Sequence, residues 1–194
     1  MTVWGLLVGV GMLLAGDYAA RPGRGASPPT EWPSGSPIHP DGRRPTLLLF
    51  LHPRCPCSRA SVAELATIAF TCGDRVSVIV ILLQPGDGRP GWSEADLETD
   101  LALLPRKGTW HDPGGAEARR FGVFTSGHVL LYDLTGHLIF SGGITPGRGH
   151  QGANDGREAV LAGILGSGGG RSVHPVFGCA LATPPGRTSN QRPQ

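Results

Sequence analysis

The stretch that decides the fold reads TLLLFLHPRCPCSRASVAEL and covers residues 46–65. Its apolar run, 47–51, has the length and content of a buried strand. After the two cysteines, apolar residues recur at the i, i+3, i+4, i+7 spacing of one buried helix face, namely Val62, Leu65, Ala66 and Ala69. Strand, short turn and helix follow one another directly, which places Cys55 at the start of a helix expected over about 57–69.

Cys55 is in the setting of a reactive thiol. The unpaired backbone N–H groups and the dipole at a helix N-terminus stabilise an anion, so a thiolate is favoured there. Arg54 and Arg59 add positive charge on either side. We therefore predict that Cys55 belongs to a redox or metal-binding site. The alternative is that Cys55 and Cys57 pack as small hydrophobic residues.

With these residues the sequence resembles the thioredoxin-like superfamily, in the branch that includes exported thiol–disulfide oxidoreductases and peroxiredoxins. The HPRCPC segment, 52–57, is also similar to that of exported bacterial proteins of the RedB type. The resemblance covers about 45–165 and includes FGV at 121–123, followed by an apolar strand that ends in Asp133 and a glycine turn. It implies an α/β fold, a thioredoxin-like three-layer α/β/α sandwich with a central mixed sheet.

The cysteine motif departs from the family's Cys-x-x-Cys. Cys55 matches the attacking cysteine, Ser58 occupies the resolving position, and Cys57 lies between them. Residues three apart share a helix face, whereas residues two apart point in nearly opposite directions. We therefore expect Ser58 to hydrogen-bond the Cys55 thiolate and Cys57 to point away from it. A Cys55–Cys57 disulfide would need a distorted turn, and such strain makes a disulfide easier to reduce.

The family's second landmark is a cis-proline just before the strand that follows FGV. That position falls at Gly127 in this sequence, so the cis-proline is missing. In the family this loop lies against the attacking cysteine and binds the substrate backbone, so its loss argues against ordinary thioredoxin-like substrate binding. His128 is expected to stand near the site instead, in either a structural or a functional role.

Topology brings a second loop to the same place. The apolar run 76–83 predicts a strand parallel to the first one, through a right-handed crossover. The strand at 129–132 is expected to run antiparallel to the first strand, and its hairpin partner, 137–141, reverses again. The C-terminal end of 137–141 then lies at the same sheet edge as Cys55, where active sites of open α/β sheets gather.

The loop that leaves this edge, 142–156, is rich in glycine and carries Arg148, His150 and Asn154. An Arg near a thiol lowers the pKa of the thiol, and a His can exchange protons with it. We predict that these groups bind an anion or tune Cys55; the alternative is a flexible connector.

Two further cysteines lie elsewhere. Cys179 is in a C-terminal tail whose apolar residues suggest that it docks on the domain. It is expected either to resolve Cys55 or Cys57 or to be a free thiol. Cys72, at the end of the first helix, is expected to be structural and far from the site.

The remaining segments complete the expected domain. Residues 86–91 read as a turn-rich loop and 93–104 as a helix that begins at Ser93. Residues 111–123 read as a loop with a short helix, and 154–165 as an amphipathic helix capped by Asn154 or Asp155.

Composition sets the domain boundaries. Of 194 residues, 31 are Gly and 18 are Pro, and they concentrate outside a compact centre. We expect a signal peptide or membrane anchor over 1–20, a Pro/Gly-rich linker over 21–44 in which Trp32 and Ile38 contact the domain, the thioredoxin-like domain over 45–166, and a tail over 167–194 that is partly docked around Cys179. The single lysine and the scattered arginines give no nucleic-acid footprint.

We therefore predict a membrane-tethered or exported protein of a bacterial inner membrane, whose domain faces the periplasm or the cell exterior. It carries out thiol–disulfide exchange or electron transfer with protein thiols or a membrane redox partner, without a cofactor. The expected site residues are Cys55 as attacker, Cys57 or Cys179 as resolver, and Arg54, Ser58 and His150 as tuning groups. A peroxidase is disfavoured because His52 stands where peroxiredoxins place a threonine or serine.

Two alternatives come from other classes. One is a copper-binding chaperone of the same fold, in which His52, Cys55, Cys57 and His150 are the candidate ligands because Cu(I) prefers soft donors. The other is a non-catalytic interaction domain with unreactive thiols.

Overall fold

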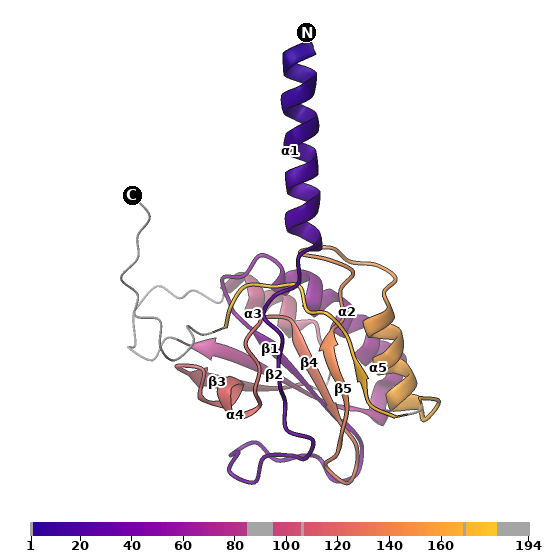
Figure 1. The fold of residues 1–194 in the computed structure, drawn as a ribbon. Helices are drawn as coiled ribbons and strands as arrows, with labels where there is room; N and C mark the ends of the chain where they lie inside the picture. Colours follow the sequence, from indigo (N-terminus) through magenta and orange to yellow (C-terminus); the bar gives the residue numbers. More distant parts are fainter. Residues whose placement is uncertain (1, 85–94, 106, 169, 182–194) are drawn as a thin grey trace.

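The computed structural model describes residues 2–84, 95–105, 107–168 and 170–181. Within them, six strands form one sheet in the order β3-β2-β1-β4-β5-β6 (Figure 1). Their bounds are Thr46–Leu51 (β1), Ser77–Gln84 (β2), Lys107–Pro113 (β3), His128–Tyr132 (β4), Leu138–Gly143 (β5) and Ser172–Val173 (β6). β1, β2 and β3 are parallel, β4 is antiparallel to β1 and β5, and β6 is parallel to β5. The predicted parallel unit and the predicted hairpin are both confirmed.

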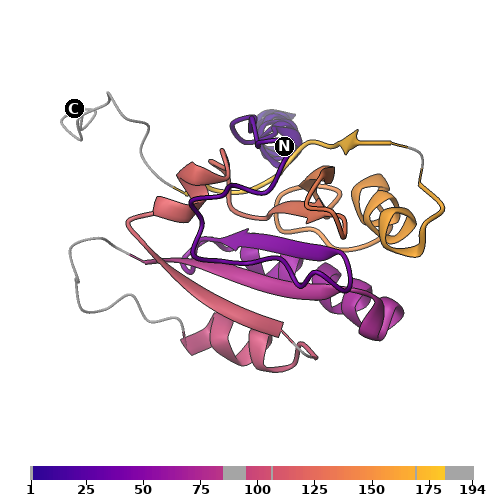
Figure 2. The same cartoon turned by 90° about the horizontal axis from the view of Figure 1, so that it is seen from below.

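Layers of chain cover both faces of this sheet, as Figure 2 shows. On one face lie α2 (Ser58–Cys72), α3 (Ala95–Ala102) and α5 (Asp155–Leu165), which share one hydrophobic core with the sheet. A short 3-10 turn, Gly73–Arg75, follows α2. The other face is covered by α4 (Ala116–Arg120), by the N-terminal arm 21–45 and by the end of the tail, which contribute to a second core. The expected α/β sandwich with a central mixed sheet is confirmed.

β1 is the centre of the molecule, and every one of its residues is buried. Leu47, Leu49 and Leu51 face the core beneath α2, while Leu48 and Phe50 face the opposite core. A strand covered on both faces has to be apolar throughout. This requirement explains the continuous apolar run from which the strand was predicted.

Two strands were not predicted, and each has a physical reason. β3 is an edge strand that pairs only with β2, and its sequence KGTWHDP lacks a run of apolar residues. The interpretation of residues 111–123 as a loop and short helix is therefore wrong for the first three of them, which end β3. β6 spans only two residues. The predicted loop 86–91 and the helix start at Ser93 lie outside the described residues.

The helix predicted over about 57–69 has the expected packing, and the one predicted over 154–165 has one of its expected caps. Val62, Leu65 and Ala69 of α2 are buried, as their spacing indicated. The Asn154 side chain caps α5 by accepting the Arg157 N–H at 2.8 Å, which confirms one of the two predicted caps.

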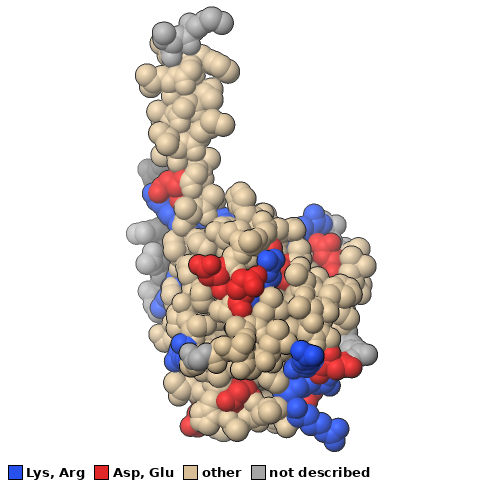
Figure 3. Space-filling view, turned by 90° about the vertical axis from the view of Figure 1, so that its right-hand side faces the viewer, with Lys and Arg blue, Asp and Glu red and all other residues tan. Residues whose placement is uncertain are grey.

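α1 (Thr2–Ala20) is an apolar helix that stands away from the domain (Figure 1). Val3–Ala20 has a mean hydropathy of 1.5 and none of it is buried. At about 1.5 Å per residue the helix reaches roughly 28 Å, close to the thickness of a bilayer's hydrocarbon core. Figure 3 shows charged side chains on the domain but not along the shaft of α1, until Asp17 pairs with Arg21 at its base. Length and composition suit a membrane span or a signal sequence.

The arm after α1 lies along the domain. The Gly23 N–H donates to the Val176 carbonyl oxygen of the tail at 2.7 Å, so arm and tail run side by side. Further along, the Trp32 ring meets the edges of Phe121 and Tyr132, and its Nε1 donates to the Ile38 carbonyl oxygen at 3.0 Å. These contacts fix the second half of the arm at Trp32 and Ile38.

Candidate functional site

Cys55 lies in the turn that joins β1 to α2. Its N–H donates to the His52 carbonyl oxygen at 3.0 Å, and its carbonyl oxygen accepts the Ser58 N–H at 2.9 Å. α2 begins at Ser58, with Cys57 in the N-cap position and without a side-chain cap. The helix thus starts one residue later than expected, and Cys55 sits just before its N-terminus as predicted.

Three cysteines meet at this turn. The Cys179 N–H donates to Cys55 Sγ at 3.3 Å, across 124 residues of chain. The thiols of Cys57 and Cys179 also lie close enough to Cys55 to lower its pKa. The expectation that Cys57 points away from Cys55 is wrong. It assumed a regular helix through Cys57, whereas Pro56 and Cys57 form a turn that precedes the helix.

These neighbours set the protonation of the thiols. Burial by itself raises the pKa of the Cys55 thiol, but hydrogen bonds from the Cys179 side chain and amide, and then from Cys57, outweigh it and leave the pKa lowered. Burial raises the pKa of Cys179 to about 12, helped by its hydrogen bond to Cys55 and by the charge of that sulfur. Burial, and then the charge of Cys55, also raises the pKa of Cys57. The site therefore favours one thiolate, on Cys55, between two thiol donors.

Ser58 is placed differently from the prediction. Its hydroxyl donates to the His52 carbonyl oxygen at 2.9 Å and lies 3.1 Å from the Ser126 hydroxyl oxygen. The expected hydrogen bond from Ser58 to the Cys55 thiolate is therefore replaced by one that holds the turn. The thiolate receives its hydrogen bonds from Cys179 and Cys57 instead.

The loop after β5 reaches the site through Arg148, as the topology indicated. One guanidinium N–H donates to the Gly178 carbonyl oxygen at 2.7 Å, next to Cys179. The positive charge of Arg148 lowers the pKa values of Cys57 and Cys179, against the larger effect of burial. His150 is exposed, and its Nδ1 lies 2.7 Å from the Arg148 carbonyl oxygen. Of the groups predicted on this loop, Arg148 therefore lies beside the thiols, whereas His150 contacts the Arg148 carbonyl oxygen.

The arginines that flank the motif lie at its surface. Arg54 is exposed, and its N–H donates to His52 Nδ1 at 3.1 Å. Arg59 forms an ion pair with Asp100 of α3, with 3.2 Å between Nε and Oδ2. Hydrogen bonds from neighbouring thiols and amides, rather than these arginines, account for the lowered pKa of Cys55.

The loop at Gly127 has no cis peptide bond among the described residues, and Gly127 has a φ of 86°. Its N–H donates to the Phe50 carbonyl oxygen at 2.8 Å, and the Ser126 hydroxyl accepts the His52 N–H at 2.8 Å. The loop is therefore joined to β1 and to the cysteine turn by hydrogen bonds. At the position where the resemblance placed a cis-proline, a left-handed glycine donates the hydrogen bond that holds the loop to β1.

His128 is buried inside the sheet. Its Nε2 lies 2.9 Å from the Ser141 hydroxyl oxygen, and burial lowers the pKa of His128 to about 4. The ring is therefore neutral near pH 7. The part of the chain that the structure describes supplies no partner for its Nδ1. His128 follows the site loop in sequence, but its ring belongs to the core.

The candidate metal ligands are only partly gathered. Cys55 and Cys57 meet, whereas His150 contacts the Arg148 carbonyl oxygen. Within the described ranges, no group of three or more His, Cys, Asp or Glu side chains is arranged to hold a metal ion. His52 is half-buried, and burial lowers its pKa.

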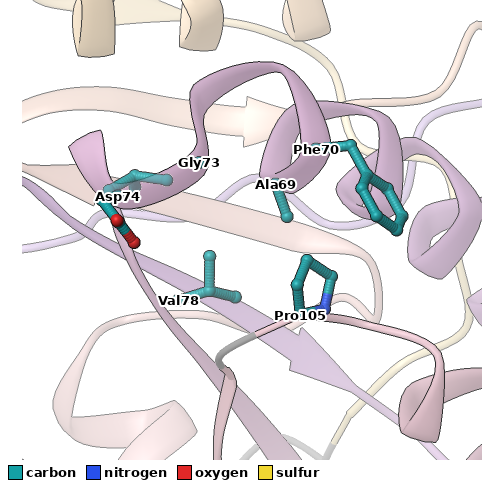
Figure 4. Close-up of a pocket in the computed structure, with 7 residues that line it drawn as sticks. Ala69, Phe70, Gly73, Asp74, Val78 and Pro105 are labelled. Carbon is teal, nitrogen blue, oxygen red and sulfur yellow. The ribbon is translucent and has the colours of Figure 1, made fainter.

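Two hollows lie outside the thiol cluster. One of about 280 Å³ lies at the far end of α2, where Ala69, Phe70 and Pro105 line it (Figure 4). Because Cys55 precedes the opposite end of that 15-residue helix, this hollow is separate from the thiols. The other, of about 320 Å³, lies beside the tail at Pro175 and Phe177.

Comparison with known proteins identifies the fold. No family model matches the chain, and no curated protein matches its sequence. A hypothetical protein from Sinorhizobium meliloti is 19% identical with a TM-score of 0.62, over 83% of this chain and 97% of that one. An uncharacterized conserved protein from Geobacillus kaustophilus is 18% identical with a TM-score of 0.61, over 87% of this chain and 95% of that one. This chain therefore shares its fold, a mixed sheet covered on both faces, with both of these proteins.

A third structure is a secreted disulfide oxidoreductase of Mycobacterium tuberculosis, described as homologous to E. coli DsbE. It is 15% identical with a TM-score of 0.44, over 63% of this chain and 81% of that one.

Sequence reasoning missed two residues that build the site. Ser126 joins the cysteine turn, through His52 and Ser58, to the tail, whose Cys179 carbonyl oxygen accepts its N–H at 2.8 Å. Gly178 passes so close to the Ser126 carbonyl that a Cβ would lie 1.9 Å from its oxygen. The glycine directly before Cys179 is the one sequence signal of this close approach.

Proposed function

We propose that this protein is a membrane-anchored thiol–disulfide exchange protein whose working pair is Cys55 and Cys179. The observation that carries the proposal is the meeting of the two residues across the whole domain, with the Cys179 N–H 3.3 Å from Cys55 Sγ. Ser58 occupies the position where the resemblance places a resolving cysteine, and Cys179 of the tail supplies that cysteine instead. The lowered pKa of Cys55 and the raised pKa of Cys179 support the proposed roles of attacking thiol and resolving thiol.

The exchange needs only these two sulfurs and a partner disulfide. The Cys55 thiolate attacks one partner sulfur, a mixed disulfide forms, and the other partner sulfur leaves and takes a proton. Cys179 then gives up its proton and attacks Cys55 Sγ, which expels the second partner sulfur as a thiolate. The product is a Cys55–Cys179 disulfide and a reduced partner. The same steps in reverse oxidise a partner dithiol.

The helix α1 supports the proposed membrane anchor and the proposed class of partner. Its length and exposed apolar surface suit a membrane span, and the base of α1 touches the site loop, because the Arg148 N–H donates to the Ala19 carbonyl oxygen at 3.1 Å. A domain held this way keeps its thiols close to the membrane surface. We infer that the partners are protein thiols at that surface, on the outer side of a bacterial inner membrane.

Thiol trapping of the full chain tests the proposal. The protein is alkylated after reducing and after mildly oxidising buffer, and its peptides are mapped by mass spectrometry. We expect a reversible bond between Cys55 and Cys179, and the same bond in a Cys72→Ala control, because Cys72 is buried at the other end of α2. A bond between Cys55 and Cys57 would reassign the resolving residue. Thiols that stay reduced under oxidant would refute the exchange reaction.

A further inference from the structure

The tail crosses the site as an added strand. Thr125 and Ala180 form an antiparallel bridge. Two main-chain hydrogen bonds flank it: the Ser126 N–H donates to the Cys179 carbonyl oxygen at 2.8 Å, and the Leu181 N–H donates to the Phe124 carbonyl oxygen at 2.9 Å. An extended peptide that pairs with a free backbone edge makes the same pattern. Residues 124–126 are therefore a strand-pairing edge, and residues 179–181 are the strand that fills it.

The same strand buries the nucleophile. Cys55 is 3% exposed, and the Cys179 N–H lies directly on its sulfur. A thiolate attacks a disulfide only where the partner sulfur can reach it. With the tail in place, no partner protein can bring a disulfide to Cys55. The structure therefore shows the site in an occupied form.

Both sides of this pairing have further hydrogen bonds; those of the tail include main-chain bonds at Pro175 and Val176. Ser126 is fixed from below, because its hydroxyl accepts the His52 N–H and the next residue, Gly127, bonds to the Phe50 carbonyl oxygen of β1. The tail is held from the loop side by Arg148, through the Gly178 carbonyl oxygen at 2.7 Å. A hollow of about 320 Å³ flanks it at Pro175 and Phe177.

Gly178 sets which peptide fits this edge. A Cβ at this position would lie 1.9 Å from the Ser126 carbonyl oxygen. Because both groups belong to the backbone, this clash can be removed only if the two strands separate. The close approach requires glycine directly before the cysteine. Leu181, 3% exposed, fills an apolar place two residues after it.

We propose that residues 176–181 are a built-in competitor for a peptide-binding edge, and that a partner protein occupies the same edge with an extended segment of the pattern Gly-Cys-small-apolar. This inference rests on the proposed exchange reaction. The tail leaves, the partner's cysteine disulfide takes the place of Cys179, Cys55 attacks it, and the partner's second sulfur leaves and takes a proton. The tail then returns and Cys179 displaces the partner from Cys55.

The experiment uses the full chain with Cys57→Ser and Cys179→Ser, so that Cys55 is the reacting thiol at the site. The probe is the peptide Val-Phe-Gly-Cys-Ala-Leu with its cysteine activated as a thiopyridyl disulfide, and the rate of mixed-disulfide formation is measured. Adding Gly178→Ala should dislodge the tail and raise the rate at least about tenfold, since access limits the attack. Gly25→Ala, where a Cβ meets no atom within 4 Å, is the matched control and should react as the parent does.

A second peptide, with alanine in place of its glycine, should react roughly tenfold more slowly with the Gly178→Ala protein if the edge reads the peptide backbone. Equal rates for parent and Gly178→Ala, or for the two peptides, would overturn the inference while leaving the exchange reaction intact. No mixed disulfide with any variant would refute the exchange reaction as well.

If Gly178→Ala does not fold, Arg148→Met removes the guanidinium contact with the Gly178 carbonyl without adding bulk to the tail. Hydrogen exchange at the Leu181 amide should then become faster, in step with peptide coupling. An unchanged amide together with faster coupling would overturn the competitor role of the tail.

Discussion

The two sides of the thiol site are built in different ways. The turn 52–58 is enclosed by β1 and α2, and its hydrogen bonds run within the turn and to Ser126, while Cys55 Sγ also accepts the Cys179 N–H. The tail 174–181 approaches from the other end of the chain and is held mainly by single main-chain hydrogen bonds to neighbouring segments. We call the turn 52–58 with β1 and α2 the fixed side, and the tail 174–181 the attached side. The fixed side carries the proposed nucleophile, Cys55, and the attached side carries the proposed resolving residue, Cys179. In the proposed exchange, the Cys55 sulfur stays in place while Cys179 gives way to a substrate.

The largest effect should come from the fixed side. Cys55→Ser removes the thiol whose pKa its neighbours lower and which the proposal makes the nucleophile, so disulfide exchange should be abolished rather than slowed. Release of the thiopyridyl group from the activated peptide is the measurement, because it records the attack even where Cys179 then displaces the peptide; mass spectrometry identifies any adduct that persists. The control is Cys72→Ala, which should couple as the wild type does. Residual coupling in Cys55→Ser, mapped to Cys57, would move the nucleophile to that residue.

Core substitutions on the two sides should differ in stability. Leu49→Ala in β1 should cost about 2–5 kcal/mol of unfolding free energy, because the substitution leaves a cavity that the surrounding core cannot fill. Leu181→Ala at the end of the tail should cost about 1 kcal/mol, because a terminal segment can relax. Urea denaturation gives both values.

The same two variants distinguish a loss of stability from a gain in access to the Cys55 thiol. At a temperature where both variants are fully folded, Leu181→Ala should speed alkylation of Cys55, while Leu49→Ala should not. Equal losses of stability and equal alkylation rates would mean that the tail is as fixed as the core.

The pH dependence of Cys55 should depend on the tail. Alkylation follows the thiolate, so its rate rises with pH as the Cys55 thiol loses its proton. In the wild type the midpoint should lie below the ordinary thiol value of 9.0, because hydrogen bonds from Cys179 and Cys57 lower this pKa. Cys179→Ala removes the side-chain donor and should move the midpoint to higher pH. A midpoint that does not move would assign the lowered pKa to Cys57 and the turn alone.

The sequence predicted the fixed side well and the attached side only in part. The apolar run of β1 and the buried face of α2 are local patterns set by burial on defined faces, so they can be read directly. The edge strand β3 lacks such a pattern because only β2 pairs with it. The contact between Cys55 and Cys179 spans 124 residues, and no local pattern encodes it. Topology alone brought the Arg148 loop to the correct edge.

The smallest expected effect tests how Ser58 acts. Sequence spacing gave Ser58 a hydrogen bond to the Cys55 thiolate, whereas the structure directs its hydroxyl to the His52 carbonyl oxygen and places it beside the Ser126 hydroxyl. Ser58→Ala should therefore cost about 1–2 kcal/mol of unfolding free energy, since buried groups lose a partner. It should leave the pH midpoint of Cys55 alkylation in place. The matched control is Thr71→Ala on the same helix, whose exposed hydroxyl bonds only to the Thr67 carbonyl oxygen and should change stability by less than about 0.5 kcal/mol. A shifted midpoint in Ser58→Ala would restore the hydroxyl as a direct partner of the thiolate, and the fixed side would then tune its own nucleophile without the tail.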